Sequence, residues 1–171
     1  MNEKNLKAGW SESTPLEVVF LKFAFPCAFI ALQRGRITRE QFNTLEDAAV
    51  NNKVLGRGDL EKYFSPAFRR MKRLAVKKSL KVWSRELMEE YYLTEHNRII
   101  DEGVEDYGSA PPVLKELCKV ISGGVTNVRG STARVGLDNG KTRAVNLDLV
   151  GPVGKGERIF VHYGYAVGIC E

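Results

Sequence analysis

The first part of the chain combines hydrophobic residues at helical spacing with polar residues that typically start helices. Residues 14–17 (TPLE) match a capping box with proline at the first helical position, and they predict a helix that runs to about Gln33. Residues 38–41 (TREQ) repeat the signal and predict a second helix that ends before Gly56. Asp59 is expected to cap a short turn beyond it.

Two more helices are predicted further along. Ser65 and Pro66 open the first of them, which continues through the basic segment FRRMKRLA. The second has the clearest pattern and is expected to end near Gly103. Its hydrophobic residues recur at spacings of three and four and therefore share one face: Val76, Leu80, Trp83, Leu87 and Tyr91.

In the last third, hydrophobic and polar residues alternate, which indicates strands. Residues 120–128, 132–137 and 141–149 each fit a strand, and two shorter strands are expected around a final turn at Gly164. Between the second and third strands, the pair Asn139-Gly140 predicts a type I′ hairpin turn, in which both central residues need positive φ. The inward positions are expected to be Ala133, Val135, Leu137, Val145, Leu147, Leu149, Ile159, Val161 and Tyr163.

Glycine marks a change of composition between these parts. Ten of the sixteen glycines follow residue 116, and the segment 107–116 contains Gly-Ser and Pro-Pro pairs typical of a linker. We therefore predict an α+β protein, with an all-α helical domain over residues 1–110 and a five-stranded barrel over residues 117–171. A small sheet must close or expose its edges, and an OB-like barrel is the economical closed form.

The 171 residues carry a formal charge of +5, which permits an acidic partner or nucleic acid without requiring either. Three cysteines are too few, and odd in number, for a secreted disulfide scaffold, so we expect reduced thiols in the cytoplasm. The polar N-terminus does not look like a signal peptide. The apolar stretch 23–32 is about half of a membrane span and is expected to be a buried helix, with no membrane association.

The candidate chemical residues are few. Cys118 could act as a thiolate ligand or be a small buried residue, and His162 could bind metal or tie two strands together. Strand alternation points His162 away from the barrel interior, to the outer face or rim. Cys27 is expected in the helical core, and His96 is expected on the surface. No nucleotide-binding loop, catalytic triad or carboxylate pair is found, so the chain is not expected to be an enzyme.

Three blocks of the last third together resemble the HypC/HupF family of NiFe-hydrogenase maturation chaperones. These blocks are residues 118–125 (CKVISGGV), 138–150 (DNGKTRAVNLDLV) and 161–166 (VHYGYA). The resemblance covers nearly all of the last third and none of the rest. In that family the cysteine follows the initiator methionine, whereas here it lies behind the helical region.

The resemblance implies a small five-stranded barrel in a non-catalytic assembly chaperone or adaptor. The family cysteine helps to hold an iron centre while a partner assembles it, so Cys118 would be the metal or partner contact and His162 would support it. The implied partners are a HypD-like maturation protein or the hydrogenase large subunit. Iron would be held transiently, and no cofactor would be bound stably.

A basic run supports an alternative from another class. Lysine and arginine on a helix face can neutralise phosphates, and OB-like barrels bind single strands, so the protein could instead bind RNA or single-stranded DNA. A solvated face or a docking surface for an acidic protein explains the same charges. The residues concerned are Arg69, Arg70, Lys72, Arg73, Lys77, Lys78 and Lys81.

Overall fold

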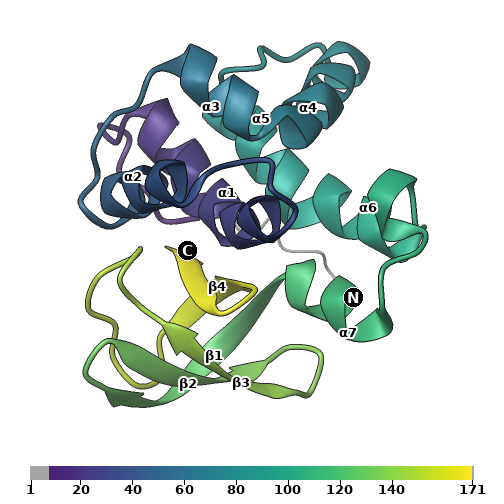
Figure 1. Cartoon of the computed structure of the whole chain (residues 1–171). Helices are drawn as coiled ribbons and strands as arrows, with labels where there is room; N and C mark the ends of the chain where they lie inside the picture. Colours follow the sequence, from purple (N-terminus) through teal and green to yellow (C-terminus); the bar gives the residue numbers. More distant parts are fainter. Residues whose placement is uncertain (1–7, 171) are drawn as a thin grey trace. The chain divides into compact units, whose positions relative to one another are not determined.

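A computed structural model describes residues 8–170 of the chain. Its contacts group these residues into two compact units (Figure 1). The helical unit consists of residues 12–95, and the barrel unit consists of residues 96–170 together with residues 8–11. The barrel unit thus includes helical residues that precede the strands, as well as a segment from the start of the chain.

The helical unit is built around the apolar helix α1. The ring centroid of Phe20 in α1 lies 4.6 Å from that of Phe68 and 5.8 Å from that of Trp83. Phe23 stacks on Tyr92, with the ring centroids 5.1 Å apart. α1 has the length and hydropathy of a membrane span, a test that core helices also pass, and more than half of it is buried. The elements are α1 Leu16–Gln33, α2 Arg39–Val50, α3 Arg57–Tyr63, α4 Ser65–Lys78, α5 Arg85–Glu90 and the π-helical turn η1 Tyr91–Glu95.

The start signals of these helices had different outcomes. At α2 the predicted capping box is confirmed: the Thr38 hydroxyl accepts from the Gln41 N–H, and the Gln41 side chain accepts from the Thr38 N–H at 2.8 Å. At α1 the predicted box is wrong, because Pro15 is the N-cap and Glu17 is paired with Arg57 instead. Asp59 is not a cap either, since α3 begins after Gly56 without a side-chain cap.

The prediction of one long helix from Val76 to about Gly103 is wrong. α4 ends at Lys78 because Ser79 adopts the left-handed conformation, with φ of +56°. A new helix, α5, then starts where the Ser84 hydroxyl accepts a hydrogen bond from the Leu87 N–H. Serine competes well for such terminal positions, and this outweighs the hydrophobic spacing. Val76, expected on the buried face, is consequently 83% exposed.

The barrel unit contains the predicted five strands, and the α+β fold class is confirmed. The strands close into a barrel in the order β1-β2-β3-β5-β4, with β3 and β5 parallel and the other pairs antiparallel. Its elements are α6 His96–Asp101, the 3-10 turn η2 Glu105–Tyr107, α7 Pro112–Cys118, β1 Val120–Arg129, β2 Thr132–Leu137, β3 Thr142–Asn146, β4 Arg158–His162 and β5 Tyr165–Ile169.

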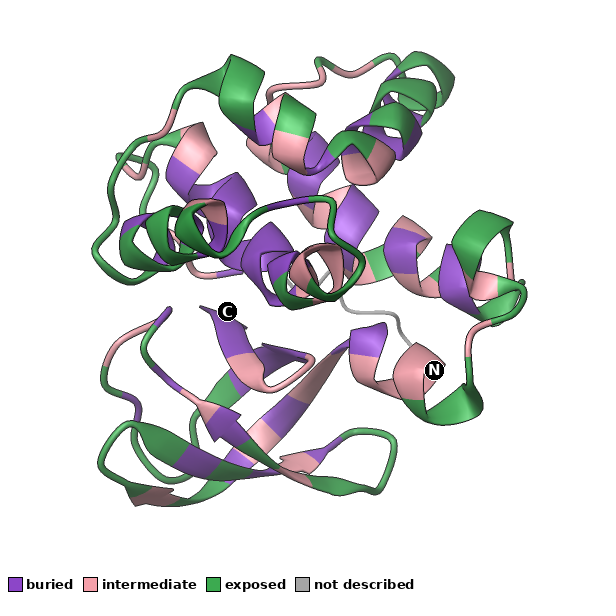
Figure 2. Ribbon diagram, viewed as in Figure 1, coloured by how far each residue is buried: buried purple, intermediate pink, exposed green. Residues whose placement is uncertain are grey.

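The alternating pattern of the strands fills the barrel as predicted, and Figure 2 shows buried and exposed positions alternating along β2. Tyr163 is the exception among the expected inward positions, since it lies in the β4–β5 turn and is half-buried. Leu149 is buried, although β3 ends earlier, at Asn146. The core cluster includes Ala133, Val135, Leu137, Val145, Leu147, Ile159 and Val161.

Both predicted turns exist but differ in detail. In the β2–β3 turn, Gly140 has φ of +82° whereas Asn139 does not have a positive φ, so the turn is not type I′. The Gly140 N–H donates to the Leu137 carbonyl and the Leu137 N–H donates to that of Lys141, as in a three-residue loop with a left-handed glycine. In the β4–β5 turn, the left-handed residue is Tyr163 with φ of +57°, and Gly164 is not left-handed.

Candidate functional site

The backbone of the barrel unit brings Cys118 and His162 together at one end of β1 and β4. Cys118 is the last residue of α7, and Val120, two residues on, is the register partner of His162. The Tyr163 N–H donates to the Leu117 carbonyl at 2.8 Å, so the neighbours of Cys118 and His162 are joined as well. Antiparallel pairing therefore places these two residues close together, although they are far apart in the sequence.

His162 has the predicted orientation but not the predicted exposure. It alternates with Ile159 and Val161, which belong to the barrel core, while His162 does not. It was expected on an outer face or rim, yet only 1% of its surface is exposed. The simple alternation rule failed here because β4 is buried on both faces over its last four residues.

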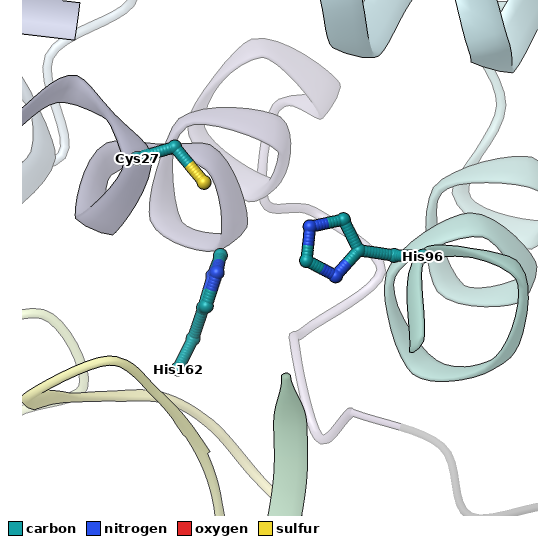
Figure 3. A group of neighbouring side chains, drawn as sticks. All are labelled: Cys27, His96 and His162. Carbon is teal, nitrogen blue, oxygen red and sulfur yellow. The ribbon is translucent and has the colours of Figure 1, made fainter. Parts of the chain in front are cut away.

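The prediction that His96 lies on the surface is wrong. His96 begins α6 and is 3% exposed. Its ring lies edge-on to that of His162, with centroids 5.3 Å apart and planes at 73° (Figure 3). One ring nitrogen of His96 lies within 4.8 Å of one ring nitrogen of His162. Tyr107 of η2 is a second aromatic neighbour of His96, at 6.3 Å.

Hydrogen bonds of Asn97, the residue after His96, hold the start of α6 against β1, the strand that pairs with β4. The side-chain amide of Asn97 donates to the Val120 carbonyl at 2.7 Å and accepts from the Val120 N–H at 2.9 Å. An ion pair between Asp101 and Lys119 also joins α6 to the segment that leads into β1. These contacts dock α6 at the start of β1, directly opposite His162.

The His96–His162 pair was missed in the sequence because no local motif marks it. Zinc motifs on helices are found by short spacings such as His-x-x-x-His, and this pair joins a helix to a distant strand. The sequence contains two histidines, and the structure buries both, but nothing in the sequence marks them as a pair. Buried histidine is less common than exposed histidine, but burial of His96 itself could not be deduced from its polar neighbours.

The turn after His162 is held firmly. The Tyr163 carbonyl accepts from the Arg143 guanidinium at 3.0 Å, and the Gly164 carbonyl accepts from the Asn146 N–H at 2.8 Å. Left-handed backbone at a non-glycine residue is unfavourable and persists when surrounding contacts fix it. The backbone at His162 is thus held by the strand on one side and by a fixed turn on the other.

The three cysteines occupy different environments, and none forms a disulfide. Cys118 is 1% exposed, and among residues 8–170 no group of three potential metal ligands includes it. Cys170 is half-buried next to β5, and burial raises the pKa of its thiol to about 11, against the opposing effect of the Arg158 charge. Cys27 belongs to α1 of the helical unit and is half-buried rather than fully in the core.

Several residues of the basic run in the helical unit are buried or paired with carboxylates. Arg70 is buried, Lys72 pairs with Glu61 at 2.9 Å, and Lys78 pairs with Glu90 at 2.9 Å. Part of the positive charge is therefore already balanced within the unit, which weakens the case for a phosphate-binding face. The other members, Arg69, Arg73, Lys77 and Lys81, are exposed.

A scan against protein-family models found no match, and a search of curated proteins found none either.

Proposed function

We propose that the protein is a non-catalytic assembly chaperone or adaptor in metallocentre maturation, similar in role to HypC and acting in the cytoplasm. The observation that supports this role most directly is the backbone pairing that brings the segment around Cys118 to the end of β4 that carries His162, on a closed barrel. A thiolate and an imidazole are both ligands for transition metals, and each has a different softness. In this proposal the two groups act together in a protein that hands on a metal centre.

In this proposal Cys118 is the contact for the metal or the partner, and His162 supports it. The iron is cargo, delivered by a HypD-like maturation protein and passed to a hydrogenase large subunit. Cys118 is almost fully buried at the end of α7, so partner docking must expose its thiol. α7 is a helix of seven residues, and opening its last turn breaks the hydrogen bond that the Leu117 carbonyl accepts from the Tyr163 N–H.

The proposal is tested by purifying the protein from its native cells and identifying what accompanies it. We expect a metallocentre maturation protein and substoichiometric iron, and we expect both to be lost in the Cys118→Ala variant. The matched control is Cys170→Ala, which removes a half-buried thiol elsewhere in the barrel unit and should keep both. Partner binding and iron content equal to wild type in Cys118→Ala would rule out the proposed role of that thiol.

The alternative role, binding of RNA or single-stranded DNA, makes a different prediction. Affinity should fall steeply with added salt and should respond to charge reversal at Arg69 and Arg73, two exposed members of the basic run. A titration with single-stranded oligonucleotides at low salt that shows no binding would remove this alternative. The ion pairs of Lys72 and Lys78 make it the second choice.

A further inference from the structure

Both histidines of the chain meet at one place in the barrel unit, although the sequence separates them widely. His96 comes from the start of α6 and His162 from the end of β4 (Figure 3). Both side chains are almost fully buried, with 3% of His96 and 1% of His162 exposed. Neutral imidazole is the commonest metal ligand among side chains.

We propose that His96 and His162 bind one divalent transition-metal ion, each through a single ring nitrogen. Two nitrogens at the usual zinc distance lie about 3.4 Å apart in a tetrahedral site. The nitrogens here lie within 4.8 Å of each other, so closing on an ion requires them to approach by at most about 1.4 Å. Imidazole pairs suit Zn²⁺, Ni²⁺ and Cu²⁺.

The surroundings fix the backbone that carries both rings before any ion arrives. Asn97 fixes the start of α6 on β1 through two hydrogen bonds to Val120, whose register partner is His162. The Leu117 carbonyl accepts from the Tyr163 N–H, which fixes the chain directly after His162. Preorganised ligands lose little conformational freedom on binding, so the pair costs less to assemble than two mobile histidines would.

This inference goes beyond the proposed function, because it concerns binding of an ion by the chain alone and does not involve Cys118 or a partner. The proposed function and the metal site can therefore be disproved independently of each other. The Cys118→Ala variant should keep its affinity for Zn²⁺, whereas the proposed function predicts that it loses its partner. Loss of the partner with retained Zn²⁺ binding would support both ideas.

The decisive experiment uses the full chain without a histidine tag, titrated with ZnCl₂ and followed by NMR of ¹⁵N-labelled imidazoles. Since the chain has two histidines, two sets of ring signals are expected. Both sets should change together and saturate at one Zn²⁺ per chain. No change, a change in one ring alone, or a lack of saturation would overturn the proposal, and this readout needs no substitution that could disturb folding.

Substitutions then measure the contribution of each ring. His96→Gln and His162→Gln should each lower the affinity for Zn²⁺, measured by calorimetry, by at least about tenfold. Cys170→Ser is the matched control and should leave the affinity unchanged, because Cys170 belongs to no ligand group among the described residues. Wild-type affinity in a folded histidine variant would overturn the proposal.

Discussion

Lys22 shows at the scale of one residue how burial of a charge affects stability. It lies on α1 with 2% of its surface exposed, and burial lowers the pKa of its ammonium group from 10.5 to about 8. The unfolded chain therefore binds this proton more tightly than the folded one. The contribution of Lys22 to stability therefore rises with pH between about 8 and 10.5, because the folded protein no longer has to keep a buried charge.

Replacing Lys22 should relieve this cost at neutral pH. We expect Lys22→Met to increase the free energy of unfolding at pH 7 by up to roughly 3 kcal/mol, with the gain shrinking as the pH is raised towards 10.5. Urea unfolding at pH 7 and pH 10 measures the difference. Lys62→Met, at an exposed position of α3, is the control and should have little effect at either pH. An equal gain at both pH values would contradict the assignment.

Two neighbouring glycines of β1 differ in the space available to a side chain. A Cβ atom on Gly123 would lie 2.6 Å from the Gly136 carbonyl oxygen and 2.8 Å from a Val135 methyl carbon. A Cβ atom on Gly124 would meet no atom within 4 Å. The nearest atom to the Gly123 position belongs to the β2 backbone, so the clash cannot be relieved by rotating a flexible side chain alone.

We therefore expect Gly123→Ala to destabilise the protein by about 2 kcal/mol or more, the range found for overpacked sites. Gly124→Ala should instead be neutral or stabilise by up to about 0.5 kcal/mol, because alanine reduces the freedom of the unfolded strand. Thermal unfolding of the two variants side by side measures the contrast. Equal melting temperatures would show that β1 and β2 can separate without cost at this point.

At the scale of elements, the sequence contains two TxxE/Q signals, of which one forms a helix cap and the other does not, and this allows a matched comparison. Thr38 caps α2 with both reciprocal hydrogen bonds, whereas no side chain caps α1 near Thr14. Thr38→Ala should cost about 1 kcal/mol of stability, and Thr14→Ala should cost much less. Chemical unfolding of both variants tests the difference. A larger loss in Thr14→Ala would mean that the start of α1 depends on that side chain after all.

The elements also show where sequence patterns sufficed and where they did not. Strands were found correctly because alternation depends on one local rule, and β2 matches its predicted range of residues 132–137. The long helix after Val76 failed because spacing cannot detect a left-handed residue such as Ser79, whose conformation depends on tertiary packing. Turns were located correctly, but their conformations at Asn139 and Tyr163 were not.

For the candidate site, the sequence pointed to residues of the last third and not to His96. Cys118 and His162 were predicted to lie together because both belong to the blocks that carry the family resemblance, and for their side chains this stays a prediction. His96 could not be connected, since its place depends on Asn97 bonding to Val120, a contact between a helix and a distant strand. A single sequence does not show which distant residues contact each other, so the histidine pair could be found only in the structure.

At the scale of the whole molecule, residues 8–11 belong to the barrel unit, although they precede the helical unit in the sequence. The Gly9 N–H donates to the Ile169 carbonyl at 2.6 Å, and Ala8 forms a bridge with Cys170. Ala8 also lies against Gly168, where an added Cβ would meet its methyl group at 3.2 Å. Residues 8 and 9 therefore pair with Ile169 and Cys170 at the end of β5, in addition to the pairing among the five barrel strands.

Removing residues 1–11 should therefore weaken the barrel unit selectively. The Ile169 carbonyl would lose the hydrogen bond that it accepts from the Gly9 N–H, so the end of the strand should open more often. We therefore expect amide hydrogens in β4 and β5 to exchange severalfold faster. Amides of α2, in the helical unit, serve as the internal control and should keep their rates. Faster exchange throughout both units would mean that the deletion lowers global stability, whereas unchanged rates in β5 would show that the N-terminal segment contributes nothing to holding the barrel closed.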